Sequence, residues 1–243
     1  MRALARQVLD LMFPPQDHGG QTAQGLGLSA EIFSKVVFLE DPVCDGCGLP
    51  FDYDQGKGVR CAACMAKPKA FTRARAACLY DEASRDLILQ FKHADRPDLA
   101  SLFSLWISRA AQPLVQDADA IVPVPLHPFR LMHRRYNQAA EIARPMARRA
   151  GLAYLADSLQ RRRDTASQGG RSGSGRQRNV AGAFWVPANK RANIRGRRLL
   201  LIDDVLTTGA TAEACAKALV QAGARSVDLA VIARVRETQN QPI

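Results

Sequence analysis

The apolar positions of the chain change from helical spacing to continuous runs toward the C-terminus. In residues 99–110 the apolar side chains recur every three or four positions, which predicts a helix with one buried face. Two continuous runs rich in branched residues, 199–205 and 227–235, are typical of parallel strands covered on both faces. The alanine-rich segment between them has helical periodicity and a stop signal at Gly223. We therefore expect a strand, a loop, a helix and a strand, which together form a βαβ unit.

Shorter patterns extend this α/β interpretation over the C-terminal two-thirds of the chain. The stretch "IVPVPL", residues 121–126, predicts a short buried strand with proline at its exit, and residues 137–150 are helix-like. Residues 161–178 are basic, polar and glycine-rich, which predicts a long loop over the edge or face of the sheet. We expect a mainly parallel sheet flanked by helices.

The N-terminal segment has a different pattern. Leu4, Val8 and Leu11 fall at helical spacing, which indicates a short amphipathic helix, and a glycine- and glutamine-rich stretch at 16–30 indicates a flexible insert. The first apolar positions are interrupted by charges, so no secretory signal is expected. No apolar run approaches the ~20 residues that a membrane span requires. We expect a cytoplasmic protein.

Charge adds one further indication. The 243 residues include 34 Lys and Arg against 23 Asp and Glu, a formal net charge of +11. This excess suggests an anionic partner, either a phosphorylated small molecule or nucleic acid, although a basic surface alone would give the same count. The sequence contains no G-x-x-x-x-G-K-[ST] loop, so ATP hydrolysis of that kind is not expected.

The stretch "LLLIDDVLTTGAT", residues 199–211, carries the most specific chemistry. Asp203 and Asp204 follow four aliphatic residues at the carboxyl end of an expected strand, where open α/β sheets bind ligands. The residues after them, Thr207, Thr208, Gly209, Ala210 and Thr211, lead into the expected helix, whose N-terminus favours an anion. Glycine lets the backbone approach a phosphate closely.

The two aspartates suit a different part of the same ligand. Carboxylates repel a phosphate, but they accept hydrogen bonds from neutral hydroxyls or bind Mg²⁺. One sugar phosphate would satisfy the whole stretch, with its phosphate in the loop and its ribose diol facing Asp203 and Asp204. The alternative is that Thr211 is only a helix N-cap and the acidic pair belongs to a solvated loop.

Four cysteines form a second motif. Cys44, Cys47, Cys61 and Cys64 have the spacing C-x₂-C-x₁₃-C-x₂-C, which is typical of a structural tetrahedral zinc site. Unliganded thiols or, less readily in a reducing compartment, a disulfide pair are the alternatives. Because four thiolates leave no open coordination position, we expect the metal to hold the fold.

Several motifs together resemble the ComF family, the competence-associated proteins similar to type I phosphoribosyltransferases. The resemblance covers about residues 42–236 and rests on "CDGCGLPF", "FKHADRPDLA", "VPVPLHPFRLMHRRYNQA", "RRRDTASQ", "RNVAGAF" and the acidic stretch. It implies a phosphoribosyltransferase-like parallel sheet flanked by helices, with a small N-terminal zinc ribbon. The expected division is an N-terminal helix and insert at 1–41, the ribbon at 42–70 and the phosphoribosyltransferase-like domain at 71–243.

The resemblance also implies a ligand, phosphoribosyl pyrophosphate (PRPP) or a related ribose phosphate, usually held with Mg²⁺. By similarity, Lys92, Arg130 and Arg134 are candidates for contacting the pyrophosphate, and surface solvation or nucleic-acid contact is the alternative for the arginines. In the same way Tyr136, Asn137 and Gln138 match the family's motif at the start of a helix.

Three functions remain open at this stage. A PRPP-dependent glycosyltransferase with an unknown acceptor needs only positioning and charge stabilisation, so the absence of a general base does not exclude it. A module that binds single-stranded DNA during DNA uptake would use the basic loops and the zinc ribbon, with DNA-uptake proteins as candidate partners. A non-catalytic PRPP sensor would use the same phosphate site.

Overall fold

The computed structural model describes residues 28, 30–92, 96–126, 136–162 and 182–236. Its centre is a five-stranded sheet in which every neighbouring pair is parallel, in the order β1-β7-β6-β2-β3. The strands are β1 (Ala74–Leu79), β2 (Ala120–Pro123), β3 (Ala153–Tyr154), β6 (Arg198–Leu206) and β7 (Ser226–Arg234). The expected parallel sheet flanked by helices is confirmed.

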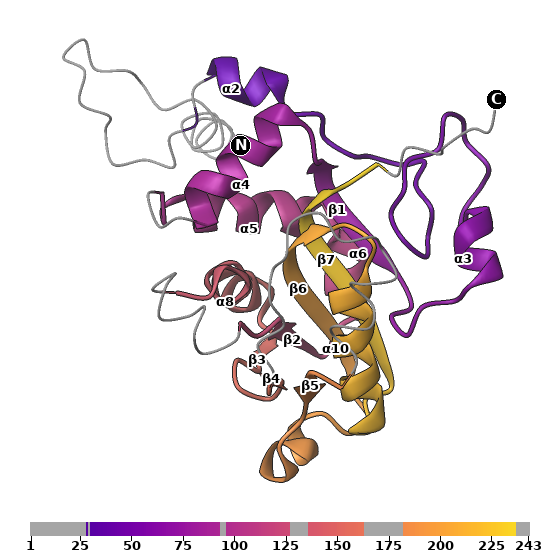
Figure 1. Cartoon of the computed structure of the whole chain (residues 1–243), viewed down its shortest axis with the longest axis vertical. Helices are drawn as coiled ribbons and strands as arrows, with labels where there is room; N and C mark the ends of the chain where they lie inside the picture. The colour runs from indigo at the N-terminus through magenta and orange to yellow at the C-terminus, as the bar shows by residue number, and fades with distance from the viewer. Residues whose placement is uncertain (1–27, 29, 93–95, 127–135, 163–181, 237–243) are drawn as a thin grey trace.

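Helices cover both faces of this sheet (Figure 1). One face packs against α5 (Leu99–Ala110) and α8 (Gln138–Ala150), with α4 (Glu82–Lys92) beside them. The other face packs against α10 (Ala210–Gln221), which connects β6 to β7. The shorter helices are α2 (Ala30–Lys35), α3 (Ala62–Ala66), α6 (Gln112–Asp117) and the 3₁₀ helix η1 (Ala188–Asn193).

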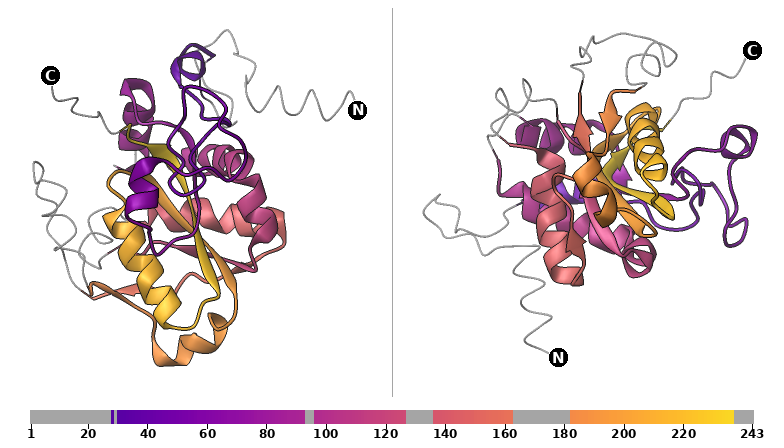
Figure 2. Two further views of the ribbon diagram at one scale, coloured as in Figure 1. Left: turned by 90° about the vertical axis from the view of Figure 1, so that its right-hand side faces the viewer. Right: turned by 90° about the horizontal axis from the view of Figure 1, so that it is seen from below.

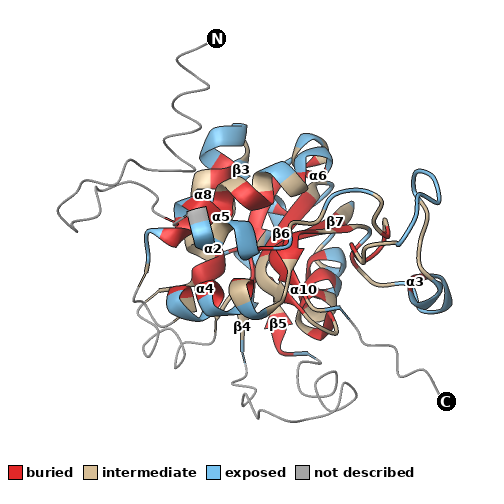
Figure 3. Cartoon of the chain, turned by 90° about the horizontal axis from the view of Figure 1, so that it is seen from above, coloured by how far each residue is buried: buried red, intermediate tan, exposed pale blue. Residues whose placement is uncertain are grey.

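The buried core follows from the two continuous apolar runs. In β6 the residues from Leu199 to Ile202 are all buried, and in β7 every residue after Ser226 is buried. Alternate residues of β6 face opposite layers, so Leu200 belongs to the cluster around α5 and α8 and Leu201 to the cluster around α10. Figure 3 shows the strands at the buried centre and the exposed α3 at the periphery.

The predicted elements of this domain form close to their expected bounds. The helix predicted at 99–110 is α5, the helix predicted at 137–150 is α8, and the βαβ unit is β6, α10 and β7. The strand predicted at 121–126 is shorter, because β2 ends at Pro123, although Val124 N still donates to Ile202 O at 2.9 Å. Gly223 lies just after α10 with a φ of 100°, as a helix stop requires.

Other expectations were wrong or fall outside the described residues. Arg161 was expected in a loop, but it pairs in β4 (Gln160–Arg161) with the antiparallel β5 (Phe184–Trp185). The side chains of this hairpin explain the pairing, because Arg161 and Arg162 stack over Phe184 and Trp185. The expected N-terminal helix, most of the glycine-rich insert and residues 163–178 lie outside the described part. The domain boundaries at 42 and 71 stay a prediction.

Candidate functional site

The chain connections single out one edge of the sheet. From β2 the chain continues through α8 to β3, and from β6 it continues through α10 to β7 in the opposite direction along the sheet. Since α8 and α10 cover opposite faces, the carboxyl ends of the adjacent strands β2 and β6 form a topological switch point. Such points leave a crevice where α/β sheets bind ligands. Figure 2 shows α8 and α10 on either side of these strands.

Asp203 and Asp204 lie near the end of β6 at this switch point. The register pairs Asp203 with Val231 and Val205 with Ala233 and leaves Asp204 without a paired residue on β7. Asp203 Oδ1 accepts a hydrogen bond from Asp204 N at 2.9 Å, and Asp204 Oδ1 accepts one from Val205 N at 2.6 Å. The pair is therefore part of the strand and fixed by it, which contradicts the alternative of a solvated loop.

The two carboxylates have different electrostatic surroundings. Asp204 Oδ2 lies 2.8 Å from Lys92 Nζ, and both side chains are about one-fifth exposed, 21% and 19%. Burial and the neighbouring charge of Asp204 raise the pKa of Asp203 to about 7, although the charges of Lys92 and Arg161 act in the opposite direction. At neutral pH Asp203 is thus present in both protonation states.

The loop after β6 consists of only three residues before α10 begins. Gly209 is the N-cap, with a φ of 77°, and Ala210 and Thr211 already belong to the helix. The alternative that Thr211 is the N-cap is therefore wrong. No side chain caps this helix. Thr207 is partly buried, and the buried Thr208 Oγ1 has no hydrogen-bond partner among the described residues, which is costly unless a ligand supplies one.

The motif Tyr136, Asn137 and Gln138 holds other elements in place around the acidic pair. Asn137 caps α8 by accepting from the main-chain N–H groups of residues 139 and 140, and its Nδ2 donates to Val124 O at 3.0 Å. Tyr136 OH donates to Phe91 O, and Gln138 Nε2 donates to the main-chain oxygen of Lys92 at 3.2 Å. These bonds fix the end of α4 beside β6.

The predicted site residues are thus brought together in part. Lys92, Asp203, Asp204 and the loop at 207–211 meet at one edge of the sheet. Arg130 and Arg134 lie outside the described residues, so their predicted contact with pyrophosphate stays a prediction. The sequence did not indicate that Lys92 pairs with Asp204, since a lysine at the end of a helix has no local signal for a distant partner.

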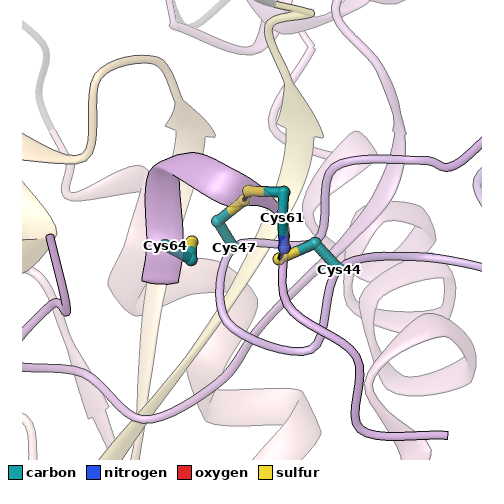
Figure 4. A group of neighbouring side chains, drawn as sticks. All are labelled: Cys44, Cys47, Cys61 and Cys64. Atoms are coloured by element: carbon teal, nitrogen blue, oxygen red, sulfur yellow. Dashed lines mark hydrogen bonds between the residues drawn. The ribbon is translucent and has the colours of Figure 1, made fainter. Parts of the chain in front are cut away.

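The four cysteines form the second site (Figure 4). Their sulfur atoms all lie within 4.8 Å of one another, and Cys47 Sγ is 3.8 Å from Cys61 Sγ. Neighbouring sulfurs of a tetrahedral zinc centre lie ~3.8 Å apart, given Zn–S bonds of ~2.3 Å. The donor set and its spacing therefore fit a tetrahedral metal ion. Cys78 and Cys215 lie apart in β1 and α10 and are fully buried, as expected for core residues.

Hydrogen bonds favour the thiolate form of one cysteine in this cluster, Cys44. Cys61 N donates to Cys44 Sγ at 3.1 Å, and a bond from the Cys47 thiol is the main cause that lowers the pKa of Cys44 to about 4. The pKa of Cys47 is raised in return, chiefly because its proton is held in this bond. A thiolate is the form that binds metal.

The cysteine segment docks on the first strand and on α10. Arg75 on β1 pairs with Asp45 at 2.9 Å, and a Cβ added at Gly48 would lie 2.9 Å from Ala74 O, so only glycine fits this contact. After α3 the chain passes the first turn of α10, where Ala70 N donates to Glu213 Oε2 at 2.7 Å. The cysteine cluster is thus attached to the helix that begins after the loop at 207–209.

Several known proteins are similar to this chain. Residues 137–242 match the family described as phosphoribosyl transferase domain. The "DNA utilization protein YhgH" of Salmonella typhimurium is 30% identical over 209 residues, which cover 84% of this chain and 88% of that protein. The protein of the same name from Escherichia coli K12 is 29% identical, with the same coverage. "Competence protein F" of Haemophilus influenzae is 29% identical and covers 79% of this chain and 85% of its own.

Solved structures give partial matches. The PRPP amidotransferase of B. subtilis complexed with ADP and GMP matches 58% of this chain with 20% identity and a TM-score of 0.37, and this chain spans only 30% of its length. The orotate phosphoribosyltransferase of Aeropyrum pernix matches 55% of the chain with 15% identity and a TM-score of 0.32.

Among the described residues, no helix has the length and apolar character to cross a bilayer.

Proposed function

Because the chain belongs to the ComF family of phosphoribosyltransferase-like proteins, we propose that it binds PRPP or a related ribose phosphate. The proposed site is the switch point between β2 and β6. The observation that carries the proposal is the buried Thr208 Oγ1, which lacks a partner among the described residues at the start of α10. A phosphate oxygen there would accept from Thr208 and from the free N–H groups of the first helical turn.

The remaining residues of the site have matching roles in this proposal. Gly209 supplies the positive φ that the turn into α10 requires, and Thr207, Ala210 and Thr211 lie around the proposed phosphate. Asp203 and Asp204 accept hydrogen bonds from the ribose diol. The pyrophosphate of PRPP would carry Mg²⁺ and face Lys92, Arg130 and Arg134, which are predictions from the family resemblance.

Calorimetry with PRPP and Mg²⁺ tests this proposal. We expect saturable binding by the wild-type protein and about tenfold weaker binding by Thr208→Val and by Asp204→Asn, because each removes a hydrogen bond to the ligand. Thr72→Val and Asp157→Asn are matched controls, since both residues are exposed and lie outside the site. No heat of binding at millimolar PRPP would rule the proposal out.

Whether the protein catalyses phosphoribosyl transfer is tested by a separate measurement. Phosphoribosyl transfer requires an acceptor, so pyrophosphate release should depend on adding a base or an amine from a panel. Acceptor-dependent release would make the protein a glycosyltransferase of the pentosyl class. Binding without release from any acceptor would favour a PRPP sensor.

We propose that the ion held by the four cysteines is Zn²⁺ and that its role is structural. Four thiolates suit zinc, and they leave no position open for a substrate. One equivalent of zinc per chain, measured after digestion with a colorimetric chelator, is the expected result. A Cys47→Ser variant should retain less than one equivalent.

A role in DNA uptake or processing is the second part of the proposal. It is supported by the relatives named for competence and for DNA utilization and by the net charge of +11. The segment 42–70 presents Tyr53, which is 70% exposed, and four basic residues, Lys57, Arg60, Lys67 and Lys69. An exposed aromatic ring suits single-stranded DNA, because bases stack on it. The residues that flank Tyr53 are the exposed Asp52 and Asp54, so the phosphates would have to be contacted by the basic residues further along the segment.

Fluorescence anisotropy with a labelled single strand tests the DNA part. Affinity should fall steeply with salt, since phosphate contacts release counterions, and Tyr53→Ala should bind more weakly at every salt concentration. The Asp204→Asn variant should bind DNA like the wild type. Undetectable or salt-independent binding would remove this part of the proposal and leave the ribose phosphate site untouched.

A further inference from the structure

Lys92 forms an ion pair with Asp204, the second residue of the acidic pair. We propose that Lys92 Nζ, and not a divalent metal ion, is the resident counter-charge of Asp204. The identity of the ligand rests on the proposed function, whereas the role of Lys92 rests on the contacts of the acidic pair itself. Any Mg²⁺ that accompanies PRPP would stay with its pyrophosphate.

The contacts of Asp204 leave little capacity for a metal ion. Its Oδ1 accepts from Val205 N at 2.6 Å, and its Oδ2 pairs with Lys92 at 2.8 Å. Mg²⁺ requires near-octahedral oxygen coordination at 2.0–2.1 Å and releases its water reluctantly. A divalent ion at Asp204 would have to displace the ammonium group or lie beside it, and the two positive charges repel each other. The arrangement of Asp204 thus does not fit a bound metal ion.

The position of Lys92 is fixed by the residues around it. It is the last residue of α4, and Gln138, which is 2% exposed, donates from Nε2 to its main-chain oxygen at 3.2 Å. The preceding residue, Phe91, is fully buried, accepts from Tyr136 OH and packs against Phe103 with ring centroids 5.4 Å apart. Since the backbone of Lys92 is held at this point and its side chain is only 19% exposed, the ammonium group is built into the site.

This assignment gives Tyr136 and Gln138 a function as positioning residues. Neither side chain needs to touch the ligand, because each bonds a main-chain oxygen at the end of α4. The motif at the start of α8 would thereby determine where the charge of Lys92 lies. A hydroxyl of the ribose can donate to Asp203 or to the remaining lone pairs of Asp204 without disturbing the ion pair.

Titration of the zinc-loaded protein with Mn²⁺ alone tests the role of Lys92. Free Mn²⁺ is counted by electron paramagnetic resonance, and Mn²⁺ does not displace zinc from thiolates because it binds such ligands more weakly. The wild-type protein should bind Mn²⁺ only at millimolar concentration. Lys92→Met should bind it about tenfold more tightly, because removing the ammonium leaves Asp204 without its paired cation.

Two variants serve as controls. Lys92→Arg keeps the positive charge and should behave like the wild type. Lys190→Met removes the lysine of another ion pair, with Asp157 at 2.5 Å, which lies outside the acidic pair, and should also behave like the wild type. Tight Mn²⁺ binding by the wild type, or equal affinity of the wild type and Lys92→Met, would overturn the proposal. The wild-type measurement decides by itself if Lys92→Met does not fold.

A second titration separates this proposal from the proposed function. Ribose 5-phosphate has no pyrophosphate, so its affinity for the wild type should be the same with and without Mg²⁺, whereas Lys92→Met should require Mg²⁺ for binding. A wild type that binds ribose 5-phosphate only with Mg²⁺ would contradict the role of Lys92. If no variant binds ribose 5-phosphate or PRPP, the proposed function fails, and the Mn²⁺ result still decides the role of Lys92.

Discussion

Adjacent identical residues can differ strongly in their chemistry, as Asp203 and Asp204 do. Their side chains leave β6 in different directions, and only Asp204 reaches Lys92. Asp203 is buried beside a like charge, so its neutral form is favoured, with a pKa of about 7. The pair therefore holds less negative charge at neutral pH than two free carboxylates would, which suits a site for hydroxyls.

This difference predicts how stability depends on pH. The folded protein binds a proton at Asp203 more tightly than the unfolded chain, so this residue lowers the free energy of unfolding as pH rises from about 4 to about 7. Asparagine does not titrate, so the Asp203→Asn variant should not lose stability in this way. Its effect on the free energy of unfolding should be about 1–3 kcal/mol more favourable at pH 8 than at pH 5. Urea denaturation at both pH values measures it.

The control for this prediction is Asp157→Asn. The pKa of Asp157 is lowered, mainly by its hydrogen bond from Lys190, so this residue does not destabilise the protein as pH rises. The Asp157→Asn variant should therefore gain no stability at pH 8 relative to pH 5. An unchanged difference between pH 5 and pH 8 in Asp203→Asn would show that the carboxylate is ionised in the folded protein throughout this range.

At the scale of elements, the junction between β6 and α10 depends on a glycine. Gly209 has a φ of 77°, and a Cβ at this position would lie 3.4 Å from Leu206 Cδ1 and 3.8 Å from the Phe71 ring. Phe71 comes from the segment that follows the cysteine cluster, and Glu213 in the first turn of α10 binds Ala70 of the same segment. The start of α10 is therefore packed from both sides.

Gly209→Ala should separate backbone strain from site geometry. We expect a loss of about 1–2 kcal/mol in stability, because a side chain is strained at positive φ. Gly151→Ala is the matched control, since Gly151 has a φ of 66° with nothing within 4 Å of an added Cβ. Denaturation should show a similar loss for both variants, but only Gly209→Ala should weaken ribose phosphate binding. Unchanged binding by Gly209→Ala would argue against the loop as the phosphate site.

At the scale of the whole molecule, the cysteine cluster and the sheet are coupled through a short connection. The cluster packs on β1 through the Arg75–Asp45 pair and continues into the segment beside α10. A small unit of this kind has few buried apolar residues of its own; Cys44, Cys47 and Cys64 make up its buried cluster. We therefore expect its stability to depend on the proposed metal ion more than on a hydrophobic core.

Removing the metal should thus destabilise the molecule. A chelator, or the Cys47→Ser variant, should lower the midpoint of thermal unfolding and reduce stability by roughly 3 kcal/mol or more, because metal binding is coupled to folding. Cys215→Ala is a control that should keep its zinc, since Cys215 lies in α10 away from the cluster. Full stability after complete removal of the metal would contradict a structural role.

The sequence by itself determined the elements and much of the candidate site. The runs at 199–205 and 227–235 predicted β6 and β7, and the cysteine spacing predicted a cluster that the structure brings within metal-binding distance. These features can be predicted because hydrophobic periodicity and cysteine spacing are patterns among residues that lie close together in the sequence. The neighbouring aspartates and the loop after them were visible for the same reason.

Only the tertiary structure decided which of these features meet. The strand order brings the end of α4 to β6, so Lys92 reaches Asp204, and the hairpin of β4 and β5 brings the charge of Arg161 to bear on Asp203. The attachment of the cysteine segment to α10 through Ala70 and Glu213 is a contact of the same kind. Such contacts depend on how strands are ordered and faces are covered, and no local pattern in the chain encodes that order.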